Sequence, residues 1–104
     1  TSLKDYRNPH IASLWYKAER ALREADRVVF IGYSLPWDDI DVIYLLKRGL
    51  VRDKEPRITV VEHSKKGPVP IQAHEAGQRY QAVFGGGLDW QPIGFENWAK
   101  SLQT

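Results

Sequence analysis

The chain has 104 residues, and its 15 Lys and Arg against 13 Asp and Glu give a formal charge of +2 at neutral pH. Such a balance makes nucleic acid an unfavoured partner, because its binding rests on strong attraction to phosphates. The lack of cysteine excludes disulfides and thiolate zinc sites. No secretory signal is present, and no apolar run approaches the roughly 20 residues of a membrane helix. We therefore expect no membrane association and a cytoplasmic location.

The length fits one domain, so we expect residues 1–104 to form a single domain without an internal linker. The sequence begins at Thr1 and not at methionine, and a helical pattern starts almost at once. We therefore expect it to start inside a longer polypeptide.

The first predicted element is a helix from Asn8 to just before Arg27. Asn8 suits the N-cap, and Pro9 suits the first helical position, where its missing N–H costs nothing. A single apolar stripe follows at helical spacing, made of Ile11, Leu14, Trp15, Ala18, Leu22 and Ala25.

The second predicted element is a strand that begins at Arg27 and ends at Gly32. Residues Val28 to Ile31 form an unbroken β-branched and aromatic run, which is typical of a parallel strand covered on both faces. Gly32 then removes a side chain at the carboxyl end of the strand, where open α/β sheets bind their ligands.

The third predicted element is a helix from Trp37 to Val51. Its first turn is acidic and its end is basic, which complements the helix dipole at both ends. The acidic residues are Asp38, Asp39 and Asp41, and the basic ones are Lys47, Arg48 and Arg52. Apolar residues occupy more than one face, so this helix needs cover on several sides.

The rest of the chain continues the alternation of helices and strands. We predict a strand over Arg57–Glu62, a loop over Lys65–Pro70, a short helix over Ile71–Gln78, a strand over Tyr80–Phe84 ended by Gly85–Gly87, and a last helix over Phe95–Leu102. This order predicts an α/β fold, a small three-layer parallel sheet of about three strands with flanking helices.

Several segments together resemble the C-terminal part of the bacterial SIR2-like, or sirtuin-related, family. The most specific is Gly32-Tyr33-Ser34-Leu35-Pro36, which is similar to the Gly-Thr-Ser-Leu segment that contacts NAD in sirtuins, with Tyr33 in place of threonine. The glycine-rich motif and the catalytic Asn and His of the family lie upstream, and no segment here matches them. The resemblance spans Asn8–Leu46, and it continues through Ile58–Glu62, Arg79-Tyr80, Phe84-Gly85 and Gly94–Trp98.

The candidate site consists of Gly32, Tyr33 and Ser34 after the first strand, the start of the helix that follows, and Glu62, His63 and Ser64 after the second strand. Adjacent parallel strands would bring these two ends to one edge of the sheet. The acidic start of the following helix would repel a pyrophosphate, so we expect contact with ribose hydroxyls or another neutral part of the ligand. Ser34 and a carboxylate can bind ribose hydroxyls. The resemblance places Glu62 where sirtuins have an asparagine that meets the adenosine ribose.

Each of these residues also has a purely structural interpretation. Ser34 could cap the second helix, Asp38 and Asp39 could only tune its dipole, Tyr33 could plug the core instead of stacking on a base, and Glu62 could be a solvated strand end. The three histidines, His10, His63 and His74, show no metal-ligand spacing, and we expect surface or packing roles for them.

The resemblance implies half of a Rossmann-like domain that forms one wall of an NAD site, without zinc. Its partners would be NAD or a related nucleotide and the missing N-terminal half. The parent protein would be an NAD hydrolase or a protein deacylase, and this chain alone would be inactive because no residue matches the catalytic base. The alternative is a non-catalytic assembly module with a degenerate pocket, and uncovered helix faces would then favour a homo-oligomer.

Overall fold

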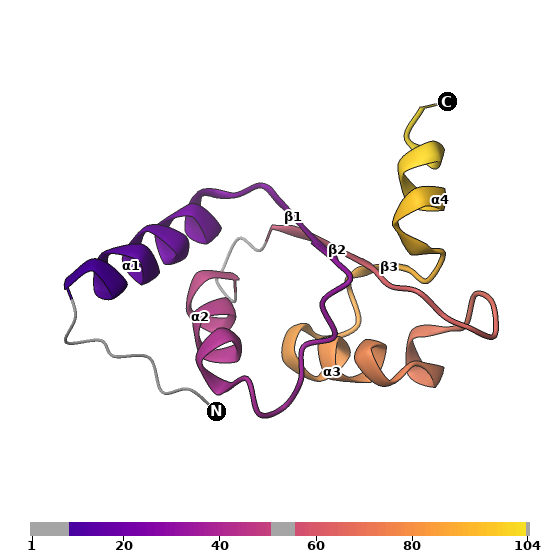
Figure 1. The fold of residues 1–104 in the computed structure, drawn as a ribbon, viewed down its shortest axis with the longest axis horizontal. Helices are drawn as coiled ribbons and strands as arrows, with labels where there is room; N and C mark the ends of the chain where they lie inside the picture. The colour runs from indigo at the N-terminus through magenta and orange to yellow at the C-terminus, as the bar shows by residue number, and fades with distance from the viewer. Residues whose placement is uncertain (1–8, 51–55, 104) are drawn as a thin grey trace.

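The structure of the chain is a computed structural model that describes residues 9–50 and 56–103. Within these ranges the elements follow the order α1 (Pro9–Glu24), β1 (Arg27–Ile31), α2 (Ile40–Leu50), β2 (Arg57–Val61), the 3₁₀ turn η1 (Ile71–Ala73), α3 (Glu75–Phe84), β3 (Asp89–Gln91) and α4 (Gly94–Ser101). Helices and strands alternate along the chain, as the sequence predicts (Figure 1).

The three strands form one parallel sheet in the order β1-β2-β3. Phe30 of β1 lies beside Val60 of β2, and Val60 lies beside Trp90 of β3. These facts confirm the predicted α/β fold with a small parallel sheet flanked by helices.

The prediction that β1 is covered on both faces is wrong. β1 is an edge strand whose central residues are only half-buried, and Ile31 at its end is exposed. The fully covered strand is β2, where every residue from Ile58 to Val61 is buried. In the described sheet an edge strand has a neighbouring strand on one side only, so side chains on both of its faces are flanked on that side alone. This leaves them partly exposed.

The main core lies between one face of the sheet and the helices α2 and α3. That face carries Phe30, whose ring packs at 5.2 Å from the ring of Tyr80 and at 5.9 Å from that of Phe84. The buried cluster is made of Leu35, Leu46, Leu50, Ile58, Val60, Ala76 and Tyr80. Because aromatic and aliphatic side chains from the sheet and both helices share it, α2 and α3 are held against the same face.

α1 packs along α2 (Figure 1). The two helices approach closely at Gly49, where a Cβ atom would lie only 2.7 Å from the Cβ of Leu22. Glu19 and Arg48 form an ion pair of 2.8 Å across the contact. α4 instead projects from the sheet on the side opposite α3 (Figure 1).

The opposite face of the sheet carries a chain of polar side chains across all three strands. Thr59 is buried at its centre, accepts a hydrogen bond from Arg27 at 3.3 Å and donates one to Asp89 at 3.3 Å. A buried hydroxyl that is satisfied on both sides costs little, so this polar residue is compatible with the central strand.

Two predicted elements need correction. The predicted helix Ile71–Gln78 is divided between η1 and the first half of α3, with His74 between them. Tyr80–Phe84 is the second half of α3 and not a strand, because apolar residues four apart, Ala76, Tyr80 and Phe84, place one helical face on the sheet. The third strand is instead the short segment Asp89–Gln91.

Some helix limits also differ from the prediction. α2 begins at Ile40 and not at Trp37, because Pro36 starts a turn that the amide of Asp39 closes on the Pro36 carbonyl at 3.0 Å. The predicted cap Asn8 and the predicted helix end with Val51 and Arg52 lie outside the described residues.

Candidate functional site

The carboxyl ends of β1 and β2 lie side by side, as the candidate site requires. Ile31 is in register with Val61, and the amide of Gly32 donates to the Val61 carbonyl at 3.0 Å. Gly32 therefore stands next to Glu62 at one edge of the sheet. A Cβ atom at Gly32 would meet nothing within 4 Å, so the backbone here faces open space.

The loop after β1 has an unusual backbone. Gly32 has φ +66°, which glycine adopts readily. Leu35 has φ +53° although it is not a glycine, and its side chain is completely buried. A left-handed leucine is strained by about 1 kcal/mol or more, so the burial of its side chain must hold the loop in this shape.

α3 fixes the same loop through two hydrogen bonds to its backbone. The Tyr80 hydroxyl donates to the carbonyl of Tyr33, and Arg79 Nε donates to the carbonyl of Ser34 at 2.9 Å. The Tyr33 hydroxyl donates to Asp39 Oδ2 at 2.5 Å, just before α2. The loop is thus held by Asp39, just before α2, and by α3, more than 40 residues later in the chain.

Burial raises the pKa of both tyrosine hydroxyls in this network. For Tyr33 the carboxylate of Asp39 adds to the effect, and for Tyr80 the charge of Glu62 does. Both hydroxyls consequently stay protonated at neutral pH and act as hydrogen-bond donors to the loop and to Asp39.

Glu62 is the most unusual residue at this edge. Its backbone is fixed between β3 and α4, because its amide donates to Gln91 and its carbonyl accepts from Gly94. The residue is only 9 % exposed, and its Oε2 is buried with no hydrogen-bond partner among the described residues. Burial raises the pKa of this carboxyl, and its electrostatic interactions with the nearby His74 and Arg79 side chains oppose that rise.

His74 links this edge to the start of α3. Its Nδ1 accepts from the amides of Ala76 at 3.1 Å and Gly77 at 3.4 Å, so it caps the helix. Because Nδ1 is an acceptor, the ring proton is on Nε2, which lies 3.1 Å from the His63 carbonyl and donates to it. The structural role expected for His74 is confirmed, whereas the side chain of His10 lies outside the described residues.

A hollow of about 200 Å³ opens at the same edge, beyond the ends of β2 and β3. His63 and Ser64 line it after β2, and Pro92, Ile93 and Asn97 line it from the turn into α4. Of the candidate residues, His63 and Ser64 line this hollow, whereas Gly32, Tyr33, Ser34 and Glu62 do not.

The structure decides several of the alternatives that the sequence leaves open. Ser34 does not cap α2, because the helix begins six residues later. Glu62 is not a solvated strand end. Tyr33 packs against the core with its ring and reaches Asp39 with its hydroxyl, which favours its structural role. Of the predicted acidic first turn, only Asp41 lies within α2.

The sequence interpretation missed His74, Arg79 and Tyr80, which hold the loop and surround Glu62. His74 stands directly before Glu75 and the apolar face of α3, and in the sequence this is only a weak sign of a helix N-cap. The contribution of Tyr80 was missed because the residues Tyr80–Phe84 also favour a strand. The contact of Arg79 with a loop 45 residues away has no signal in a single sequence.

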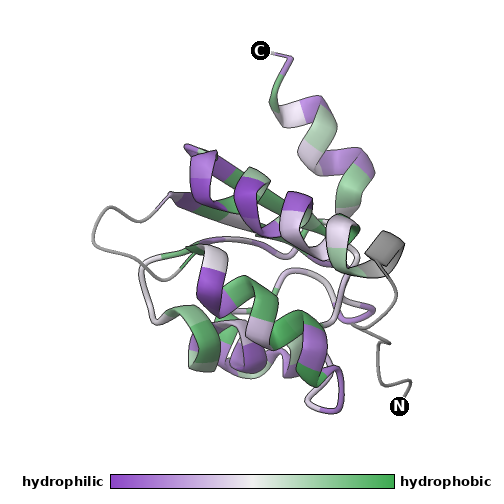
Figure 2. Cartoon of the chain, turned by 90° about the vertical axis from the view of Figure 1, so that its left-hand side faces the viewer, coloured by the Kyte–Doolittle hydropathy of each residue, from purple (hydrophilic) through white to green (hydrophobic). Residues whose placement is uncertain are grey.

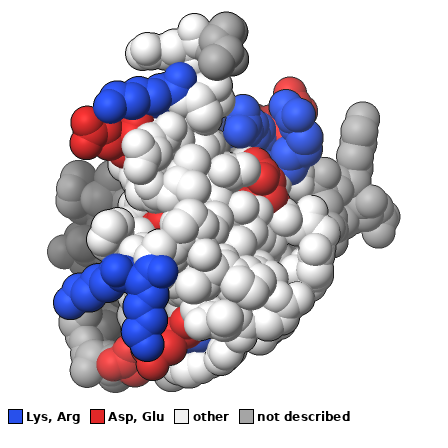
Figure 3. Space-filling view, turned by 90° about the vertical axis from the view of Figure 1, so that its right-hand side faces the viewer, with Lys and Arg blue, Asp and Glu red and all other residues white. Residues whose placement is uncertain are grey.

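On the face drawn in Figure 3, basic and acidic groups lie next to one another around a broad uncharged area. This face therefore has no large patch of one charge sign that would favour a highly charged partner. In the described part of the chain, no helix is long and apolar enough to cross a membrane. Among the same residues, no three His, Asp or Glu side chains are grouped as metal ligands. Comparison with protein-family models, curated proteins and solved structures finds no match in any of the three.

Proposed function

We propose that the edge formed by Gly32, Tyr33, Ser34 and Glu62 is one wall of an NAD site in the C-terminal part of a SIR2-like domain. The observation that carries the proposal is the orphaned Oε2 of Glu62, buried next to Gly32 at the carboxyl edge of a parallel sheet. An acceptor without a donor at this place is suited to a ligand hydroxyl.

The residues fit a ribose better than a phosphate. Glu62 can accept from a ribose hydroxyl, and the exposed Ser34 can donate or accept. Asp38 and Asp39 lie just beyond the loop, and no lysine or arginine in residues 9–50 and 56–103 forms an ion pair with them, so a pyrophosphate would be repelled. Phosphates would then be held by the remainder of the domain.

In this proposal NAD supplies the reactive bond between its ribose and nicotinamide, and the chain contributes to binding alone. His74 cannot serve as a base while Nδ1 caps α3 and Nε2 bonds to His63. The chain by itself should leave NAD intact, and cleavage by a larger parent, an NAD hydrolase or deacylase, requires a base from elsewhere.

The test is a titration of the chain with adenosine in which binding is detected from the amide NMR signals of Gly32–Ser34 and His63. We expect saturable shifts at these residues, and none with 2′,3′-dideoxyadenosine, which lacks the ribose hydroxyls. Glu62→Gln and Ser34→Ala should weaken binding, whereas Ser13→Ala, on the exposed face of α1, should not. Equal binding of the two nucleosides would contradict the role of the ribose hydroxyls.

NAD itself provides the second arm of the test. If the edge is a wall of an NAD site, NAD should shift the same signals as adenosine and compete with it. Shifts confined to other regions, or no saturation with either ligand, would refute the proposed site.

A further inference from the structure

The outer face of α2 exposes apolar side chains that no described element covers. Ile40 is 69 % exposed and Tyr44 is 62 % exposed, and they lie four residues apart on one side of the helix. In Figure 2, α2 is mostly hydrophobic along its length, whereas α1 above it is mostly hydrophilic. Two adjacent large apolar side chains at such exposure offer apolar surface that a partner can bury.

The charges on this face are arranged by sign along the helix. Asp41 lies in the first turn, and Lys47 and Arg48 lie in the last turn. Asp41 makes no ion pair with the other described residues. A helix whose start is acidic and whose end is basic is complementary to an antiparallel copy of itself.

Helix geometry makes this complementarity specific. Successive residues turn by about 100° and rise by about 1.5 Å, so Asp41 and Arg48 lie on the same flank of Tyr44, and Ile40 and Lys47 lie on the other. A twofold axis at Tyr44 would place Asp41 of one copy beside Arg48 of the second, at heights that differ by about 1.5 Å. Each Ile40 would lie beside the aliphatic stem of a Lys47.

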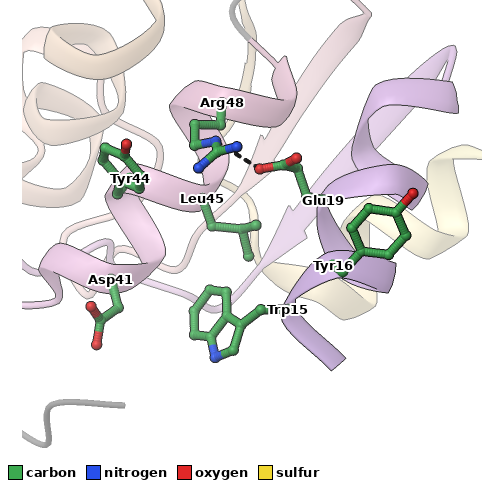
Figure 4. A pocket seen from close by; sticks show the side chains of 7 residues that line it. All are labelled: Trp15, Tyr16, Glu19, Asp41, Tyr44, Leu45 and Arg48. Atoms are coloured by element: carbon green, nitrogen blue, oxygen red, sulfur yellow. Dashed lines mark ion pairs between the residues drawn. The ribbon is translucent and has the colours of Figure 1, made fainter. Parts of the chain in front are cut away.

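Arg48 is already oriented for this contact. Its Nε bonds to Glu19 at 2.8 Å, and its guanidinium lies 5.6 Å from the centre of the Tyr44 ring. Figure 4 shows this pair crossing from α1 to α2 above a hollow that Asp41 and Tyr44 also line. The other guanidinium nitrogens form no further ion pair with the described residues, so they can bind a second carboxylate. The hollow of about 350 Å³ gives a second arginine room beside Asp41.

From these observations we propose that the chain forms a homodimer in which α2 packs antiparallel on α2 of a second copy, with the two Tyr44 side chains at the twofold axis. The apolar surface supplies the contact, and two Asp41–Arg48 pairs set the antiparallel direction. The proposal is independent of the nucleotide site.

The first measurement is the mass of the chain in solution by sedimentation equilibrium over a wide range of concentration. We expect the mass of two chains at high concentration. Tyr44→Glu places two like charges at the axis and should raise the dissociation constant by about tenfold or more. The matched control is Phe95→Glu on α4, where the side chain is 56 % exposed, and it should leave the mass unchanged.

The second measurement tests the direction of packing. Asp41→Arg and Arg48→Asp should each weaken the dimer, because each homodimer brings like charges together twice. An equal mixture of the two variants should dimerise again, because both contacts then join opposite charges.

A third variant covers the case in which Arg48→Asp disturbs the contact with α1. The chain has no cysteine, so Tyr44→Cys should form a disulfide-linked dimer on oxidation and Phe95→Cys should not. The proposal would be overturned by a monomer at every concentration, or by a dimer that Tyr44→Glu does not weaken. It would also be overturned if the mixture of Asp41→Arg and Arg48→Asp stays monomeric and the two cysteine variants cross-link equally.

Discussion

Replacement of Glu62 by glutamine should stabilise the fold at neutral pH. The Glu62 side chain is buried and its Oε2 has no partner among the described residues. Leaving a buried polar atom unpaired costs about 1–3 kcal/mol, and more when the group is charged. Glutamine keeps the shape and removes the charge, but its amide nitrogen is still unpaired. We therefore expect the free energy of unfolding of Glu62→Gln to exceed that of the wild type by about 1 kcal/mol.

The gain should depend on pH in a defined direction. Burial raises the pKa of Glu62 in the folded state above its unfolded value, so the folded chain holds this proton more tightly. As pH rises from about 4.3, the usual pKa of glutamate, through the raised folded value, the wild type loses stability and the variant does not. The difference between them should therefore be small in acid and largest above the folded pKa.

Urea unfolding at a series of pH values measures this difference. Glu96→Gln is the matched control, because Glu96 is exposed and its ion pair among the described residues is with Lys100 alone, at 3.5 Å. Its effect should stay within about 0.5 kcal/mol. A Glu62→Gln variant that is less stable than the wild type at neutral pH, or a gain that does not change with pH, would refute the reasoning.

Three further predictions concern the residues that shape the site and the helix contact. His74→Ala removes the α3 cap and should lower the free energy of unfolding by about 1 kcal/mol, while His74→Asn, which can also cap, should recover most of it in the same thermal unfolding assay. Tyr80→Phe leaves the Tyr33 carbonyl unpaired and should cost about 1–3 kcal/mol; hydrogen exchange should quicken in the loop after β1, and unchanged exchange there would argue against the tether. Gly49→Ala forces a Cβ against Leu22 and should cost about 1–3 kcal/mol in urea unfolding, so a neutral result would mean that α1 and α2 separate readily.

The sequence predicts the strands β1 and β2 and their shared edge well, because continuous β-branched runs are a local signal. The same local signal fails at Tyr80–Phe84, where Tyr, Val and Phe suit a strand but the chain forms a helix. There the deciding interaction is the packing of Tyr80 and Phe84 on Phe30, about 50 residues earlier in the chain. A single sequence carries no record of that contact.

The candidate site is likewise only partly predictable from the sequence. Gly32 and Glu62 are predictable because strand ends and parallel pairing place them together. The burial of Glu62 is not predictable, since it depends on α3 lying over the carboxyl edge, and the start of α3 depends on the His74 cap. The position of β1 at the edge of the sheet also has no local signal, because its apolar run is the same as that of an interior strand.

The departures from ordinary folding rules are concentrated at one place in this chain. Leu35 has a left-handed backbone, and Glu62 buries a carboxylate oxygen without a partner, and both lie where β1 and β2 end. In the rest of residues 9–50 and 56–103, the buried side-chain polar atoms have partners, as the hydrogen bonds that join Arg27, Thr59 and Asp89 illustrate. Such costs persist where function requires them and are removed where it does not. Their coincidence at the carboxyl edge of a parallel sheet is therefore a physical argument for a binding site at this edge, and it does not depend on the resemblance of the sequence to any family.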